Sequence, residues 1–316
     1  MIFLKKIERF FPIFLISGLL FGFFAHNTFI KLEPYIPYFL IGIMTLLFLK
    51  IDLLDILKHI KKPFLLIYIS AIHLLLLPFL SYWLFQFLQP NLRISIVLLA
   101  ALPAGVSSAV FTDIMKGKTS LALTIVIITN LLAIISIPFV FLLLSKLGDP
   151  SFLKLNAFNV NYLSMFNRLS IIIFLPLLIA KILKKVILKN LINKFNLPSY
   201  YNLSILALLF LMISTAISFQ AQTIKLNFPL LIVDVGLLFL AFIVFQFIGY
   251  FAVFWMKKGE KIAAANATMI MNNILGIVLS IAFFQEIPSI MLYVILSFIP
   301  WNVMIILKHW YLKYLP

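Results

Sequence analysis

Long apolar segments follow one another along almost the whole chain. Of its 316 residues, 64% are hydrophobic and only 11% are charged, and the mean hydropathy of +1.18 is far above that of soluble domains. Runs such as 171–179 are continuously apolar, whereas the strands of a membrane barrel would alternate apolar and polar residues. The sequence therefore predicts an all-α polytopic membrane protein.

Charged residues, prolines and asparagines divide the apolar sequence into segments of membrane-spanning length. The predicted spans are 10–25, 34–50, 63–88, 93–115, 119–146, 161–188, 200–221, 228–256, 260–284 and 288–312. The first of them follows Lys5, Lys6 and Arg9 without a convincing cleavage site, so we expect a retained helix rather than a signal peptide.

The basic residues support this division into ten spans. Of the 25 lysines and arginines, all but six fall on one side of the membrane, and a missing or extra helix would remove the asymmetry. We therefore expect an integral membrane protein, typical of a bacterial inner membrane, with both termini cytoplasmic. The net charge of +16 is concentrated beside helix ends, which favours contact with anionic membrane lipids and argues against nucleic-acid binding.

The longest polar connection, residues 148–161, separates five predicted helices from five others. This predicts a first repeat at 1–155 and a second at 156–316, together forming one intertwined membrane domain. An odd number of helices in each repeat inverts their orientation, an arrangement in which secondary transporters bind substrate on discontinuous helices.

A proline and a glycine interrupt the fourth predicted helix at residues 102–108. Proline removes a helical N–H and glycine loosens the backbone, so the next half-helix begins with free N–H groups at Val106, Ser107 and Ser108. Such groups can bind an anion. Because irregular backbone at membrane depth occurs only inside protein or beside a cavity, this break predicts transport.

The fourth helix of the second repeat carries a matching polar interruption at residues 263–276. Adjacent amides at Asn272 and Asn273 point about 100 degrees apart on a helix, so one partner helix could hardly satisfy both. They either hold helices together or contact a ligand. The same two readings stay open for Asn130 in the fifth span and for His73 in the third, where an imidazole could carry a proton or simply bond a carbonyl.

An enzyme is not predicted. The chain has no cysteine, which excludes disulfides, thiolate metal sites and cysteine nucleophiles. Asp113 and Asp234 are expected at opposite membrane faces and could not form an aspartyl dyad. Gly105 and Ser107 with His73 lack the rest of a serine protease motif.

Several of these motifs together resemble the bile acid:sodium symporter family. They are Pro103-Ala-Gly105-Val-Ser107-Ser108, Thr112, Lys116-Gly117, and Thr129-Asn130-Leu131-Leu132 with Pro138. The resemblance covers most of the first half and is weaker over 263–284. It implies ten helices in two inverted five-helix repeats, with panel and core subdomains and with discontinuous helices 4 and 9 crossing in the core. It also implies import of organic anions with sodium.

Most sodium ligands implied by this resemblance are absent. The family's site serine corresponds to Ser108, but its asparagine falls on Ala109 and its fifth-helix hydroxyls fall on Ala122 and Val126. The third-helix glutamine corresponds to His73, and the ninth-helix glutamate falls at or near Asn266. Sodium requires several hard oxygen ligands, so no metal site is predicted and a role for sodium stays open; no other cofactor is expected.

The sequence thus predicts a secondary transporter that moves a small organic anion by alternating access, with proton or sodium coupling open. The alternatives are an uncoupled facilitator or exporter, and a non-transporting receptor or assembly protein. Residues predicted to bind the substrate are Gly105, Val106, Ser107, Ser108, Asn130, Asn272 and Asn273. Residues predicted to bind a coupling ion or proton are His73, Ser108, Thr112 and Asn266.

Overall fold

The computed structural model describes residues 11–50, 63–147, 152, 161–186 and 197–311. Within these ranges, six helices are long and apolar enough to cross a membrane. They are His26–Leu46, Phe64–Leu84, Thr119–Lys146, Tyr162–Lys185, Leu203–Asn227 and Pro229–Phe251. These features agree with the predicted all-helical polytopic membrane protein.

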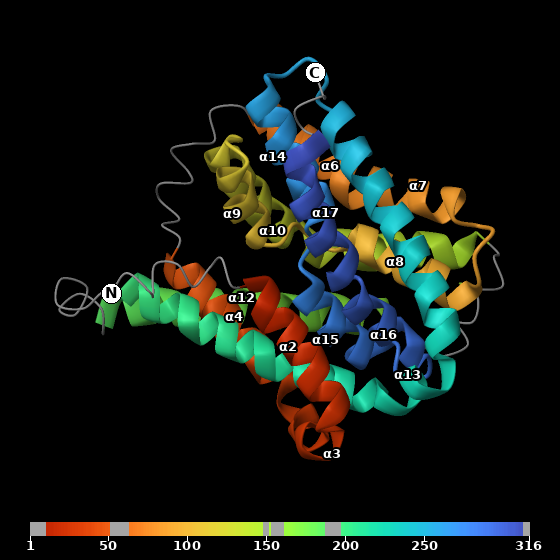
Figure 1. Ribbon diagram of the computed structural model, residues 1–316. Helices are drawn as coiled ribbons and strands as arrows, with labels where there is room; N and C mark the ends of the chain where they lie inside the picture. The colour runs from red at the N-terminus through yellow and green to blue at the C-terminus, as the bar shows by residue number, and fades with distance from the viewer. Residues whose placement is uncertain (1–10, 51–62, 148–151, 153–160, 187–196, 312–316) are drawn as a thin grey trace. The chain divides into compact units, whose positions relative to one another are not determined.

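Helices account for nearly all of the described chain (Figure 1). In chain order they are α2 (Phe11–Phe24), α3 (His26–Phe29), η2 (Ile30–Tyr35), α4 (Ile36–Lys50), α6 (Pro63–Ala71), η3 (Ile72–Leu76), α7 (Leu77–Leu84), α8 (Pro90–Ala101), α9 (Ser107–Ile114), α10 (Thr119–Lys146), α12 (Tyr162–Val186), α13 (Leu197–Phe251), α14 (Lys258–Met269), α15 (Asn273–Phe283), α16 (Pro288–Leu296) and α17 (Phe298–Tyr311).

The seventh and eighth predicted spans, 200–221 and 228–256, correspond to Leu203–Asn227 and Pro229–Phe251. The two helices of α13 meet at a kink at Asn227 (φ −117°, ψ 16°), so the first of them continues through the connection expected at 222–227. Nothing in 222–226 is a proline or glycine that would end the helix earlier. Pro229, two residues later, accounts for the kink, because its ring clashes with the preceding turn.

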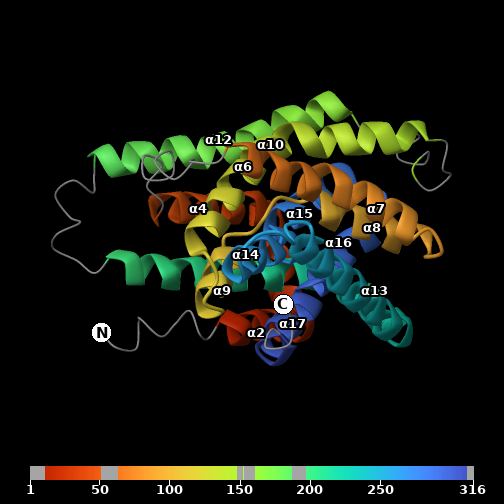
Figure 2. The same cartoon turned by 90° about the horizontal axis from the view of Figure 1, so that it is seen from above.

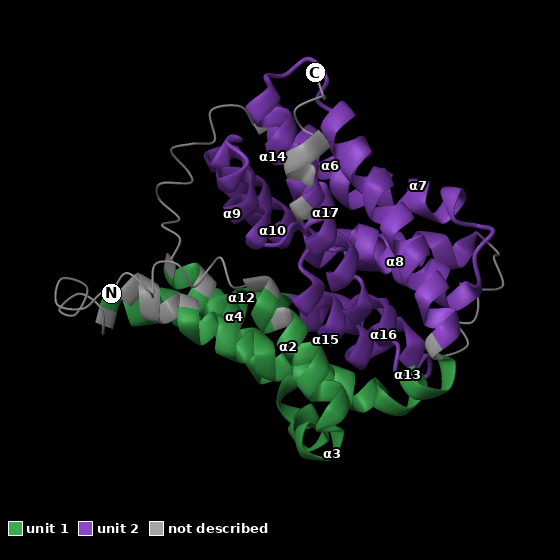
Figure 3. Ribbon diagram, in the orientation of Figure 1, with its two compact units in different colours: residues 1–53, 170–228 green, residues 54–169, 229–316 purple. Residues whose placement is uncertain are grey.

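The chain divides into two compact units (Figure 3). Unit 1 comprises residues 1–53 and 170–228, and unit 2 comprises 54–169 and 229–316. Each unit therefore combines an early segment of the chain with a late one. The repeat boundary predicted between residues 155 and 156 lies outside the described residues.

Close helix packing in unit 1 depends on two glycines one helical turn apart. A Cβ atom at Gly22 would lie 2.8 Å from the Cα atom of Ser214, so α2 and α13 approach closely there. The Ser214 hydroxyl donates a hydrogen bond to the Gly18 carbonyl oxygen at 3.1 Å. Small residues at such spacing permit backbone contact between membrane helices.

Unit 2 contains two groups of packed helices. Helices α9, α10 and α14 contact one another, and α8 contacts α7, α15 and α16. The neighbouring positions of α7 and α8, and of α9 and α14, can be followed in two perpendicular views (Figures 1 and 2). Two helix breaks lie in this unit, between α8 and α9 and between α14 and α15.

Candidate functional site

The first break has a direct cause in the sequence. A residue that precedes proline is driven to extended backbone, and Leu102 before Pro103 has ψ 144°. Helix α8 therefore ends at Ala101, and α9 begins only at Ser107. No side chain caps the start of α9. The N-terminal amides of α9 thus depend on backbone, water or a ligand for partners.

The second break has no proline. Helix α14 ends at Met269, and Asn272 caps the start of α15 by accepting a hydrogen bond from the Leu275 N–H through its side-chain oxygen at 3.2 Å. Asparagine is among the preferred residues at this position because its side chain replaces a missing backbone acceptor. The polar residues of this segment therefore restart a helix at membrane depth.

The two breaks pair with each other across unit 2. Ala104 and Met271 form an isolated antiparallel bridge. On either side of it, the Gly105 N–H donates to the Ile270 carbonyl oxygen and the Asn272 N–H donates to the Pro103 carbonyl oxygen, each at 2.8 Å. We call this paired segment, residues 103–105 with 270–272, the crossing. Its hydrogen bonds satisfy backbone groups that lipid could not.

Helix α10 fixes the crossing through two adjacent side chains. The Thr129 hydroxyl accepts a hydrogen bond from the Ala104 N–H at 3.2 Å, and the Asn130 amide donates to the Ala104 carbonyl oxygen at 3.0 Å. The Asn130 side-chain oxygen in turn accepts from the Asn272 amide at 3.2 Å. All three side chains are buried. Asn130 and Asn272, predicted to contact substrate, therefore both take part in holding the crossing.

Three backbone N–H groups next to the crossing have no hydrogen-bond partner among the described residues. They belong to Val106 and Ser107 at the start of α9 and to Ile274 at the start of α15. All three residues are partly exposed, although most of their neighbours are buried. The Ser108 N–H, which the sequence also predicted to be free, donates to the Gly105 carbonyl oxygen at 2.9 Å because the backbone turns tightly there.

Two buried side-chain oxygens at the same helix starts are also unpartnered within the described chain. They are the Ser108 hydroxyl and the Asn273 amide oxygen. The Asn273 nitrogen donates to the Ser297 hydroxyl. Buried polar atoms without partners are uncommon in folded proteins, so these positions indicate a place where water or a ligand completes the hydrogen bonding.

His73 lies in η3, a π-helical turn between α6 and α7. Its side chain is fully buried beside the backbone of Leu102, the residue at which the first break begins. Neither ring nitrogen has a hydrogen-bond partner within 3.5 Å among the described residues. Single π-helical turns often occur at functional sites.

Thr112 and Asn266 form a separate buried contact between α9 and α14. The Asn266 amide nitrogen donates to the Thr112 hydroxyl at 2.9 Å, and that hydroxyl donates to the Ser108 carbonyl oxygen at 2.7 Å. Both residues are fully buried. The predicted coupling residues Ser108, Thr112 and Asn266 are thus brought together.

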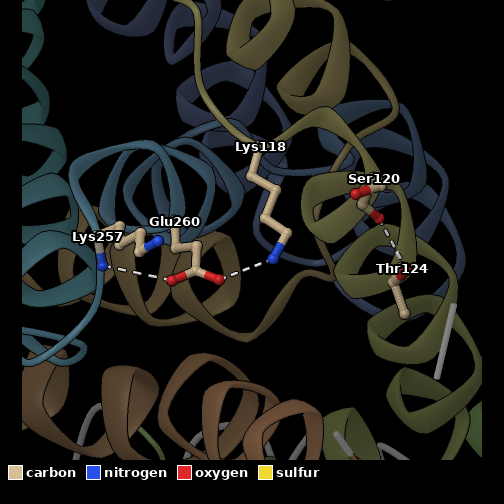
Figure 4. Close-up of polar contacts among 5 residues, drawn as sticks. All are labelled: Lys118, Ser120, Thr124, Lys257 and Glu260. Atoms are coloured by element: carbon tan, nitrogen blue, oxygen red, sulfur yellow. Dashed lines mark hydrogen bonds and ion pairs between the residues drawn. The ribbon is translucent and has the colours of Figure 1, made fainter. Parts of the chain in front are cut away.

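The start of α14 is also linked to Lys118 in the connection between α9 and α10 (Figure 4). The Lys118 ammonium group pairs with the Glu260 carboxylate at 2.8 Å, and the other carboxylate oxygen accepts from the Lys257 N–H at 3.3 Å. The Lys118 N–H donates to the Gly259 carbonyl oxygen at 2.8 Å. These contacts hold the start of α14 against the connection that follows α9.

The sequence of the chain matches the model of one protein family. The model of the sodium bile acid symporter family matches residues 37–227, more than half of the chain. The chain belongs to this family. Family membership indicates a membrane transporter of the bile acid–sodium symporter type and agrees with the prediction that the chain is not an enzyme. No curated protein matches the chain.

The family match includes the first break and α10 but ends before the second break. The pairing between the two breaks is therefore an observation of the structure. Within the described residues, no group of three or more histidines, aspartates or glutamates could hold a metal ion. The candidate site is thus the crossing with its free amides, and all of it lies in unit 2.

Proposed function

We propose that this protein is a secondary transporter that moves an organic anion by exposing the crossing to the two sides of the membrane in turn. The observation that carries the proposal is the presence of three backbone amides, at Val106, Ser107 and Ile274, that have no hydrogen-bond partner within the described part of the chain and lie beside paired helix breaks. Helix starts bear partial positive charge and attract carboxylates or sulfonates. Discontinuous helices with such starts are typical of substrate sites in secondary transporters.

The proposed topology has ten spans in two inverted repeats. Helix pairs α6–α7, α8–α9, α14–α15 and α16–α17 each form one span, and α13 forms two. The distribution of basic residues supports cytoplasmic termini, an inner bacterial membrane and contact with anionic lipids. A reporter enzyme that is active only in the cytoplasm tests this orientation. It should be active when it is fused to either terminus.

Binding of an organic anion is expected to depend on its negative charge. We expect taurocholate, or a smaller carboxylate from a panel, to raise the thermal unfolding midpoint of the purified protein by mass action. The uncharged amide of the same compound should raise it much less, because the free amides at Val106, Ser107 and Ile274 bind a charged oxygen more strongly. Equal stabilisation by acid and amide would contradict an anion site.

Engineered cysteines then locate the site in this cysteine-free chain. Ser107→Cys, at the partly exposed start of α9, should react with a maleimide more slowly when the stabilising anion is present. Glu286→Cys, in the exposed turn after α15, serves as the control and should react at the same rate with and without the anion. Protection at Ser107 without uptake into proteoliposomes would indicate a receptor, and uptake without accumulation would indicate a facilitator.

We further propose that proton coupling, where the transporter uses it, depends on His73. The imidazole has no hydrogen-bond partner within 3.5 Å among the described residues and lies beside the backbone of Leu102, where the first break begins. We expect His73→Gln to abolish the extra uptake that an inward proton gradient produces while leaving substrate exchange intact, because glutamine cannot carry a proton. Proton-driven uptake that persists in this variant would remove His73 from the mechanism.

A further inference from the structure

The name of the family implies sodium as the co-transported ion. A cation buried at membrane depth loses its hydration, and several oxygen ligands with a nearby carboxylate must replace that hydration. The positions that the family resemblance assigns to sodium are His73 in η3, Ser108 and Ala109 on α9, Ala122 and Val126 on α10, and Asn266 on α14.

Three of these positions form part of a packed apolar cluster. Ala109, Ala122 and Val126 are each at most 2% exposed, and none has a side-chain oxygen. The other buried members are Leu66, Ile69, Ala104, Leu121, Ile125, Val253, Ala263, Ala264 and Ala267. Because Ala104 belongs to the crossing itself, this apolar cluster adjoins the crossing.

At a fourth position, that of Asn266, the side-chain nitrogen points toward Thr112. The Thr112 hydroxyl donates its only proton to the Ser108 carbonyl oxygen, so it can only accept from Asn266. This fixes the Asn266 amide with its nitrogen toward Thr112 and toward the Met115 sulfur at 3.7 Å. A glutamate here would offer negative charge, whereas the amide nitrogen carries a positive dipole that opposes a cation.

Nearby carboxylates do not supply the missing charge. The sequence has no acidic residue between Lys261 and Gln285. Glu260 pairs with Lys118 at the far end of α14, and Asp113 is exposed and accepts a hydrogen bond from Thr119. Asp234 is buried on α13, where Tyr293 and Gln89 donate to its carboxylate.

We infer that apolar packing has replaced the sodium site in this protein, and that it binds and moves its substrate without sodium. The uptake part of this inference rests on the proposed transport function, while the binding part does not. Among the implied positions, the side-chain oxygens that remain are the Ser108 hydroxyl and the Asn266 amide oxygen, and two neutral oxygens cannot replace the hydration shell of sodium.

Thermal unfolding of the purified wild-type protein tests the binding part directly. At equal ionic strength, its unfolding midpoint should be the same in sodium chloride, potassium chloride and choline chloride at every concentration, because a ligand stabilises only a protein that binds it. A saturable rise specific to sodium would overturn the inference.

Restoring the implied sodium ligands should restore sodium binding. The combined variant Ala109→Asn, Ala122→Ser, Val126→Thr and Asn266→Glu should gain a sodium-specific rise of the midpoint over potassium. The single variant Asn266→Glu, which changes one side chain, should gain a smaller one. If sodium stabilised the wild type as much as the variants, apolar packing would not have replaced the sodium site. If the combined variant does not fold, the wild-type measurement still tests whether the protein binds sodium.

Uptake separates failure of this inference from failure of the proposed function. Proteoliposomes given the anion that stabilises the protein should take it up at equal rates from sodium and potassium buffers. Faster uptake with sodium would refute the inference and leave transport standing. Absence of uptake of every anion in both buffers would refute the transport function and leave the sodium-binding result unchanged.

Discussion

Replacing Gly105 with alanine is expected to lower the free energy of unfolding by about 2 to 4 kcal/mol, through overpacking and strained hydrogen bonds. A Cβ atom at this position would lie 2.7 Å from the carbonyl oxygen of Met271 and 3.1 Å from its carbonyl carbon. Both are backbone atoms of the opposite break, so they cannot move aside by a change of rotamer. The bond from the Gly105 N–H to the Ile270 oxygen must then lengthen.

Gly236→Ala provides the matched control for this substitution. Gly236 lies in the middle of α13, and an added Cβ atom would meet nothing within 4 Å. Because alanine is the better helix former, this control should be neutral or stabilise the protein by about 0.5 to 1 kcal/mol.

Chemical unfolding in mixed micelles measures the free energy of unfolding for both variants. The Gly105 variant should also lose its stabilisation by the organic anion, because the amides of α9 follow directly after the displaced backbone. A Gly105 variant as stable as the wild type would show that the two breaks do not need close backbone contact.

The crossing shows how far the sequence predicts this site. Pro103 and Gly105 mark the first break because their effects on the backbone are local, acting within one helical turn. The second break contains no proline, and only its polar residues indicated it. Its pairing with the first break depends on hydrogen bonds between segments more than 160 residues apart, such as Gly105 with Ile270, and no local pattern encodes them.

The free amides show a different limit of sequence reasoning. Ser108 was predicted to offer its N–H, but a tight turn occupies that group. Ile274 was not predicted at all, since its apolar side chain gives no signal. The available signal was its place two residues after Asn272, because the first amides after a capping residue have no partner within their own helix.

The asparagines illustrate why residue type alone does not assign a role. Asn130 and Asn272 were predicted as substrate contacts, with helix contact as the alternative. The structure places their amides against each other and against the crossing backbone. An amide can satisfy protein or ligand equally well, and only the three-dimensional arrangement distinguishes the two.

Removing the Asn130 amide is expected to destabilise the protein by about 2 to 5 kcal/mol, since each buried polar group left without a partner costs about 1 to 3 kcal/mol. Asn130→Leu takes away the donor to the Ala104 carbonyl oxygen and the acceptor of the Asn272 amide, with little change of volume. Asn130→Asp loses the donor but keeps an oxygen that can accept from the Asn272 amide. It should therefore retain the contact with Asn272 that Asn130→Leu loses.

Asn302→Leu serves as the control for Asn130→Leu. Among the described residues, the Asn302 amide nitrogen donates to the Phe298 carbonyl oxygen of its own helix, and its side chain is partly exposed. The same chemical change there should therefore lower the free energy of unfolding by no more than about 1 kcal/mol.

A double-mutant cycle separates the contact between Asn130 and Asn272 from their other roles. Asn272→Ala alone also removes the cap of α15, worth about 1 kcal/mol, which the single variant cannot distinguish from loss of the Asn130 contact. Free energies of unfolding measured for both single variants and the double variant should give a coupling energy of about 0.5 to 3 kcal/mol. A coupling near zero would mean that the contact between the two amides does not stabilise the crossing, and that α10 holds the crossing through Ala104.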